Sequence, residues 1–279
     1  MNNPAESIEA YHANGAISHS KLECYRRRPA LFWKKYVAKT LPEVEPTAAF
    51  RIGSAVHCAV LEPTEFAARY VLKPDLDRRT KEGKAAFADF EAQHAGKVIL
   101  SADDMAQTEA MQCAVMSHPI ASQLFNDGMP EVTWRKEQPN ALRALQCRTD
   151  WFSSLGCELT DGEPYVVDLK TVESLDNDAF RNFERAAFSF GYHRQAGFYL
   201  PLINEIFQRP VSRMFYVAVE KCEPYGVAVY RLSDDAIARG QDENIADLIA
   251  LKKSYETNSW PNIEPVIHDL GLPKWYQQP

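Results

Sequence analysis

Three short segments in the middle of the chain have the residue pattern of strands, whereas the segments on both sides have helical spacing. The strand-like segments are VTWRK (132–136), LRALQCRTDWF (142–152) and YVVDLKTV (165–172), and the turn signals QPN and TDGEP separate them. We therefore expect a meander of three antiparallel strands inside an α/β protein whose N-terminal region is helical.

Punctuation and periodicity divide the chain into three parts of one domain. These parts are 1–126, which is mainly helical, 127–233, which contains the strands, and 234–279, which is a long helix to about Thr257 followed by a tail. Thr47 and Ser101 are expected to cap helices in the first part, and Gly191 to interrupt a helical stretch in the second. At 279 residues the chain can build one sizeable core.

Composition excludes several classes of protein. The net charge of -7 gives no general attraction to a polyanion, so nucleic-acid binding would need local basic clusters. The six cysteines stand singly, and only Cys222 follows the central segments, which argues against a zinc site and an iron-sulfur cluster. Without an apolar segment long enough for a membrane, we expect a cytoplasmic protein with no membrane partner.

The residues that most directly indicate chemistry are Asp150, in CRTDW, and the Asp168 and Lys170 pair in VVDLKT. Residues two apart on a strand point to the same face, and pairing of the two strands would bring Asp150 close to Asp168. Two carboxylates could hold Mg²⁺, with the lysine beside it, and this arrangement suits phosphodiester hydrolysis. Alternatively, the pair could belong to the solvated face of an edge strand. The apolar run 165–167 favours a buried strand, where an unpartnered carboxylate is costly.

Four motifs in fixed order carry a family resemblance: FRIGSAVHCAVLEP, CRTD, VVDLKT and GYHRQAGFYL. Together they resemble the PD-(D/E)xK nuclease superfamily, and within its RecB-like branch the RecE-type exonucleases, which are exonuclease VIII-like. The resemblance runs from about Ser18 to Trp260. It implies a restriction-endonuclease-like core, in which helices flank a mixed central sheet.

The resemblance also implies roles for individual residues. Asp150 and Asp168 resemble the metal-binding carboxylates and Lys170 the catalytic lysine, while His57 and the Leu169 backbone carbonyl would complete the metal shell. Gln195 and Tyr199 are similar to the Q-x-x-x-Y motif, whose spacing places both on one helical face. His57 could instead be a core histidine.

Two further acidic residues are possible members of the site or of its surroundings. Glu131 could add a third carboxylate or be an exposed acid after a proline turn. Glu62, five residues after His57, is expected to be a surface carboxylate at a helix end.

The segment from Ser20 to Lys39 is the best candidate for phosphate binding, because it has seven lysines and arginines against the single acid Glu23. Its aromatic residues are expected to be core and its cations functional. The candidate DNA-binding residues are Arg26, Arg27, Arg28, Lys34, Lys35, Arg148 and Arg194, with Arg143 as a further candidate.

The resemblance implies a processive exonuclease that depends on Mg²⁺, or on Mn²⁺, and has no iron-sulfur cluster. It would degrade double-stranded DNA ends in the 5′-to-3′ direction, as a homo-oligomeric ring (trimer or tetramer), and leave 3′ single strands for a RecT-type single-strand annealing protein. Two alternatives stay open: a catalytically silent DNA-binding or assembly module of the same fold, and a RecB-like nuclease with endonuclease activity.

Overall fold

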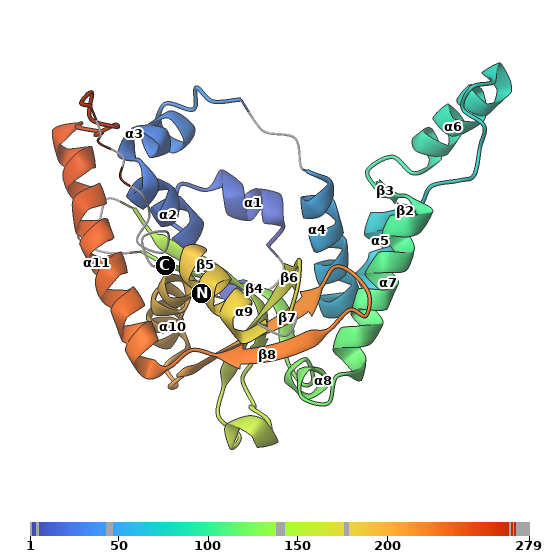
Figure 1. Ribbon diagram of the computed structural model, residues 1–279. Helices are drawn as coiled ribbons and strands as arrows, with labels where there is room; N and C mark the ends of the chain where they lie inside the picture. Colours follow the sequence, from blue (N-terminus) through green and yellow to red (C-terminus); the bar gives the residue numbers. More distant parts are fainter. Residues whose placement is uncertain are drawn as a thin grey trace.

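A six-stranded sheet forms the centre of the protein in the computed structural model, which describes residues 2–3, 6–42, 47–137, 143–175, 179–267, 269 and 271 (Figure 1). In spatial order the strands are β1 (Asn2–Asn3), β4 (Met129–Lys136), β5 (Leu145–Ser153), β6 (Tyr165–Val172), β7 (Arg213–Glu220) and β8 (Val227–Arg231). Only β6 and β7 pair in parallel, and the other neighbours are antiparallel. The expected meander is therefore confirmed as β4, β5 and β6, within a mixed sheet.

The central strand β6 is covered on both faces. Tyr165, Val166, Val167 and Leu169 have no solvent exposure, and Asp168 between them is only 4% exposed. A strand buried on both sides reads as a continuous apolar run rather than an alternating one. This burial explains why YVV precedes the aspartate, and it excludes the solvated edge strand.

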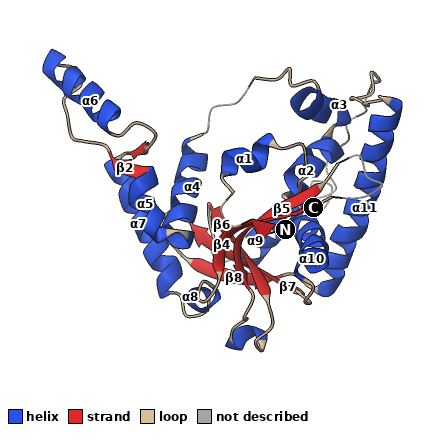
Figure 2. Cartoon of the chain, turned by 180° about the vertical axis from the view of Figure 1, so that it is seen from behind, coloured by secondary structure: helices blue, strands red, loops and turns tan. Residues whose placement is uncertain are grey.

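Helices pack on the two faces of the sheet (Figures 1 and 2). One face is covered by α4 (Ala48–Leu61), α7 (Ala102–Ser117) and α8 (Ala121–Leu124). The other is covered by α2 (His19–Arg27), α3 (Pro29–Phe32), α10 (Tyr192–Phe207) and α11 (Asp234–Thr257). The expected caps are confirmed, since Thr47 accepts from the amide of Phe50 and Ser101 forms a capping box with Asp104.

The remaining elements are short or peripheral: α1 (Ile8–Ala13), the π-helix η1 (Trp33–Val37), α5 (Pro63–Arg69), α6 (Lys81–Gln93), the 3-10 helix η2 (Glu158–Thr160) and α9 (Ala179–Ser189). Gly191, with φ of +69°, separates α9 from α10, which confirms the expected interruption. Among the described residues no helix combines the length and apolarity needed to cross a bilayer.

The expectation that residues 1–126 are helical is wrong in two places, at β1 and at the pair β2 and β3. Strands β2 (Tyr70–Leu72) and β3 (Val98–Leu100) pair in parallel, and together with α6 they project from the main body (Figures 1 and 2). Three residues are too few to produce a period-2 pattern, and the longer helical patterns around them dominate the sequence signal.

The approach of α10 to α11 gives the first prediction. A Cβ atom at Gly240 would overlap the backbone carbonyl of His193, so Gly240→Ala should force the helices apart and lower the free energy of unfolding by about 1–3 kcal/mol. Gly53→Ala on α4 is the matched control, because its nearest contact would be Thr171 Oγ1 at 3.5 Å. Urea unfolding of both variants checks this, and equal stabilities would contradict it.

Candidate active site on β4, β5 and β6

Strand pairing brings the two predicted aspartates together. Trp151 on β5 lies opposite Val167 on β6, so the next residues, Asp150 and Asp168, are neighbours where the two strands separate. The Oδ2 atom of Asp150 accepts a hydrogen bond from the amide of Leu169 at 2.8 Å. The proximity expected from the sequence is therefore confirmed, and the backbone of β6 fixes one carboxylate directly.

His57 reaches Asp150 from α4. Its Nδ1 atom lies 2.8 Å from the carbonyl oxygen of Gly53, one turn earlier, and its Nε2 atom lies 3.3 Å from Asp150 Oδ2. Burial lowers the pKa of His57, but the hydrogen bond and charge of Asp150 outweigh it and raise the pKa to about 9. Burial likewise opposes ionisation of Asp150, yet His57 keeps the pKa of that carboxyl below its usual value. His57 and Asp150 thus form an ion pair.

Lys170 and Gln195 hold the second aspartate. The ammonium of Lys170 contacts Asp168 Oδ2, and the side-chain amide of Gln195, on α10, donates to Asp168 Oδ1 at 2.6 Å. Burial lowers the pKa of Lys170, but the negative charge of Asp168 outweighs it, so the pKa is raised and Lys170 is an ammonium at neutral pH. Burial raises the pKa of Asp168, and the charge of Lys170 acts against that rise.

Two tyrosines of α10 extend this arrangement. The ring centroid of Tyr192 lies 4.9 Å from Lys170 Nζ, a cation–π contact. Tyr192 was not predicted, although it stands three residues before Gln195 on the same helical face, which is the signal that could have found it. Burial raises the pKa of Tyr199 well above its usual value, while its hydrogen bond with Gln195 acts in the other direction. Gln195 therefore links Tyr199 to Asp168.

Glu131 completes a row of carboxylates across three strands. Pro130 pairs with Trp151 and Val132 with Thr149, which places Glu131 opposite Asp150. Burial and the charge of Asp150 raise its pKa, and Arg148 Nε donates to its carboxylate at 2.6 Å. Its φ of +54° is unusual for a residue with a Cβ atom, and such strain concentrates at functional sites. Glu131 is therefore not an isolated surface acid.

The chemistry of these groups fits a divalent cation. Three carboxylates from neighbouring strands supply the oxygen ligands that such ions prefer, and the Lys170 ammonium balances the charge at the buried Oδ2 atom of Asp168. However, across the described residues no three His, Cys, Asp or Glu side chains converge as a metal-ligand set. His57 and the Leu169 amide turn toward Asp150 instead, so a metal would have to displace protein cations from these oxygens.

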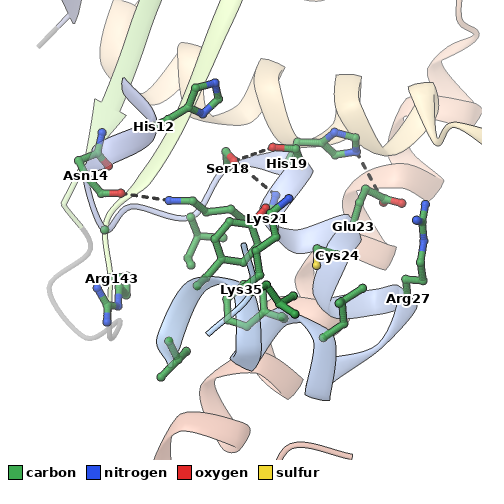
Figure 3. Close-up of a pocket in the computed structure, with 18 of the residues that line it drawn as sticks. His12, Asn14, Ser18, His19, Lys21, Glu23, Cys24, Arg27, Lys35 and Arg143 are labelled. Atoms are coloured by element: carbon green, nitrogen blue, oxygen red, sulfur yellow. Dashed lines mark hydrogen bonds and ion pairs between the residues drawn. The ribbon is translucent and has the colours of Figure 1, made fainter. Parts of the chain in front are cut away.

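A large basic cavity opens beside this site (Figure 3). Its volume is about 1780 Å³, and Lys170, Tyr192 and Gln195 lie in its wall. Its other cationic lining residues are Lys21, Arg27, Lys35, Lys39 and Arg143, and the only acidic one among the described residues is Glu23. The cations come from α2, η1, the segment after η1 and the segment before β5, so they surround the cavity rather than gather at one point. A net acidic protein therefore has a strongly basic interior surface.

Three of the predicted DNA-binding arginines have internal partners. Arg26 binds Asp247 and Glu243 of α11, Arg194 binds Glu23 and Glu243, and Arg148 binds Glu131 and the backbone oxygen of Glu6. These guanidinium groups are therefore not free, because acids distant in sequence neutralise them.

The other predicted cations and Glu62 are placed differently. Arg27 and Lys35 line the cavity, whereas the exposed side chains of Arg28 and Lys34 lie outside its lining. Of the aromatic residues in this segment, Tyr25 and Phe32 are buried core residues as expected. Glu62 closes α4 and pairs with Arg69, away from the site, as expected.

A mixed sheet with helices on both faces, carrying Asp150 on one strand and the D-x-K pattern on the next, defines a PD-(D/E)xK nuclease fold. Residues 18–264 match the family described as "PDDEXK-like domain of unknown function (DUF3799)". The chain belongs to this family, and the fold class expected from the sequence is confirmed. Divalent metal ions are the usual cofactors of the superfamily.

A comparison with solved structures supports the same fold. A crystal structure of a "putative exonuclease" from Eubacterium rectale matches with a TM-score of 0.60 and 13% sequence identity, covering 96% of this chain and 95% of the other. At this identity the similarity supports the fold alone. No curated protein matches the chain in sequence.

The pairing of Glu23 with Arg194 gives a prediction about pH. Although burial opposes it, the contacts of Glu23 with His19 and Arg194 lower the pKa of its carboxyl to about 2, from an ordinary value of 4.5. The ionised Glu23 carboxylate therefore contributes its full share to the free energy of unfolding above pH 4.5, and this contribution declines as the pH falls toward 2. In urea unfolding, wild type should exceed Glu23→Gln in stability at pH 6, and the difference should shrink at pH 3. A difference that grows on acidification would contradict the assignment.

Proposed function

We propose that the chain is a metal-dependent exonuclease that hydrolyses phosphodiesters at the ends of double-stranded DNA. The observation that carries the proposal is the buried Asp168, which is ion-paired to Lys170, adjacent to Asp150, and located where the basic cavity meets the sheet. A buried acid and lysine with perturbed pKa values, beside a cavity that attracts phosphate, are typical of a phosphoryl-transfer site.

Each residue has a role that its contacts support. Lys170 is charged and can orient the attacking water and stabilise negative charge on the phosphate oxygens. Gln195 fixes the orientation of Asp168, and His57 with the Leu169 amide fixes that of Asp150. A divalent cation bound by Asp150, Asp168 and Glu131 would lower the pKa of water and neutralise charge. In the reaction a water oxygen bonds to phosphorus, the bond to the leaving sugar oxygen breaks, and that oxygen takes up a proton.

The finer parts of the proposal come from the RecE-type resemblance. They are Mg²⁺ as the ion, 5′-to-3′ polarity, processivity through a ring of three or four subunits, and transfer of the 3′ strand to a RecT-type annealing protein in recombination. The cavity supports only the more general claim of phosphate binding, because its cations outnumber its single acid.

Removing either half of the Asp168 and Lys170 pair should abolish hydrolysis. We expect Asp168→Asn and Lys170→Met to lower the rate of digestion of linear duplex by about a hundredfold or more, and EDTA to stop the wild type. Lys221→Met is the matched control, since this lysine pairs with Glu173 and does not line the cavity. Gel assays with Mg²⁺ and with Mn²⁺ measure the rates. DNA that is bound but not cut by wild type with either ion would instead indicate a silent binding module.

The dependence on a free end distinguishes an exonuclease from an endonuclease. We expect linear duplex to be degraded and covalently closed circles to survive, with products of 5′-labelled duplex appearing before those of 3′-labelled duplex. Circles cut as fast as linear duplex would show an endonuclease, and early loss of the 3′ label would reverse the proposed polarity.

Cations that line the cavity should contribute to DNA affinity, whereas exposed neighbours outside it should not. Lys35→Ala should weaken DNA binding and reduce the slope of log affinity against log salt by about 0.7 for each single-strand phosphate that the variant no longer neutralises. Lys34→Ala is the control, because Lys34 is equally a surface lysine on η1 but does not line the cavity. Fluorescence anisotropy at several salt concentrations measures both, and equal slopes for the two variants would contradict the expectation.

A further inference from the structure

An exposed phenylalanine stands at the wall of the basic cavity. Phe190 is 67% exposed, lies in the turn between α9 and α10, and is among the residues that line the cavity. An exposed aromatic ring beside charged groups offers a flat apolar face on which a planar ligand can stack.

The position of Phe190 connects it to the reacting groups. Its ring stacks on Tyr192, with centroids 6.1 Å apart and planes 21° apart, and Tyr192 in turn lies against Lys170. A flat group stacked on Phe190 would therefore extend the row of rings that starts at Tyr192, next to the ammonium that contacts Asp168. The turn is fixed by Gly191, whose positive φ begins α10.

The surroundings of Phe190 define the chemistry of the ligand. The cationic lining would attract a chain of phosphates, and the aromatic ring offers a surface for a planar group. A nucleic-acid strand combines the two. In a duplex the faces of each base are covered by its neighbours, so a base can stack on a protein ring only at an end or in an unpaired strand.

Phe188, two residues earlier, provides a contrast. It is 74% exposed, as exposed as Phe190, but it does not line the cavity and its ring stacks on His193, with planes 8° apart. The two phenylalanines are therefore similar in exposure, and they differ in that only Phe190 lines the cavity.

We propose that Phe190 is a base-stacking residue that receives the unpaired end of a DNA strand in the basic cavity and positions its phosphate toward Lys170. This inference rests on the proposed nuclease function and specifies its substrate at the site as a single-stranded end. Phe190 is a positioning residue, because it acts on the base and not on the reacting phosphate.

Binding without hydrolysis tests the proposal. A short single-stranded oligonucleotide with 2-aminopurine near its end is mixed with the protein in EDTA, and anisotropy and base fluorescence are recorded. Stacking should quench the fluorescence in wild type, and Phe190→Leu should lose the quenching and bind about tenfold more weakly. Phe190→Trp should restore both, because it keeps an aromatic face. Phe188→Leu is the matched control and should stay within about twofold of wild type.

The outcomes separate this inference from the proposed function. Equal binding and quenching in Phe190→Leu and wild type, equal losses in both leucine variants, failure of Phe190→Trp to restore quenching, or no binding by wild type would each overturn the stacking role. Quenching that depends on Phe190, in a protein that cuts no DNA with Mg²⁺ or Mn²⁺, would overturn the nuclease function and leave the stacking role intact. Thermal unfolding of each variant shows whether a loss reflects misfolding.

Discussion

The pairing of β5 with β6 is the constraint on which the rest of the site depends. It forces Asp150 and Asp168 together in the interior of the sheet, and β4 adds Glu131 on the far side of Asp150. Like charges buried side by side are costly unless cations compensate them. The chain supplies the cations from different elements, with His57 from α4 and Lys170 from β6 itself. Because the cation that pairs with Asp150 comes from α4, the site is complete only when that helix has packed on the sheet.

The two compensating cations are not equivalent. His57 is anchored through Gly53 to its own helix and holds Asp150, whereas Lys170 lines the cavity and lies between Asp168 and the Tyr192 ring. Of the two, only Lys170 combines contact with a buried carboxylate and access to a phosphate. This asymmetry favours an assignment in which His57 organises the site and Lys170 takes part in the reaction.

Local sequence patterns made the centre of the fold predictable. Features that depend on contacts between distant parts of the chain could not be predicted in this way. The apolar run before Asp168 indicated a buried strand, and Gly191 marked the start of α10. The parallel pair β2 and β3 was missed because three-residue strands leave no periodicity. The partners of Arg26 and Arg194 could not be foreseen, since Glu243 lies far along the chain and meets them only through the packing of α11.

The same packing explains how a chain of net charge -7 contains a basic cavity. Helix α11 places Glu243 and Asp247 against the outward side of α2, where they neutralise Arg26, and the pairing of Glu23 with Arg194 neutralises the one acid found among the described residues of the cavity wall. Arg27, the next residue on α2, turns to the cavity instead. Acidic groups are therefore engaged on one side of the helix while cations line the other, and the field inside the cavity has the opposite sign from the protein's net charge.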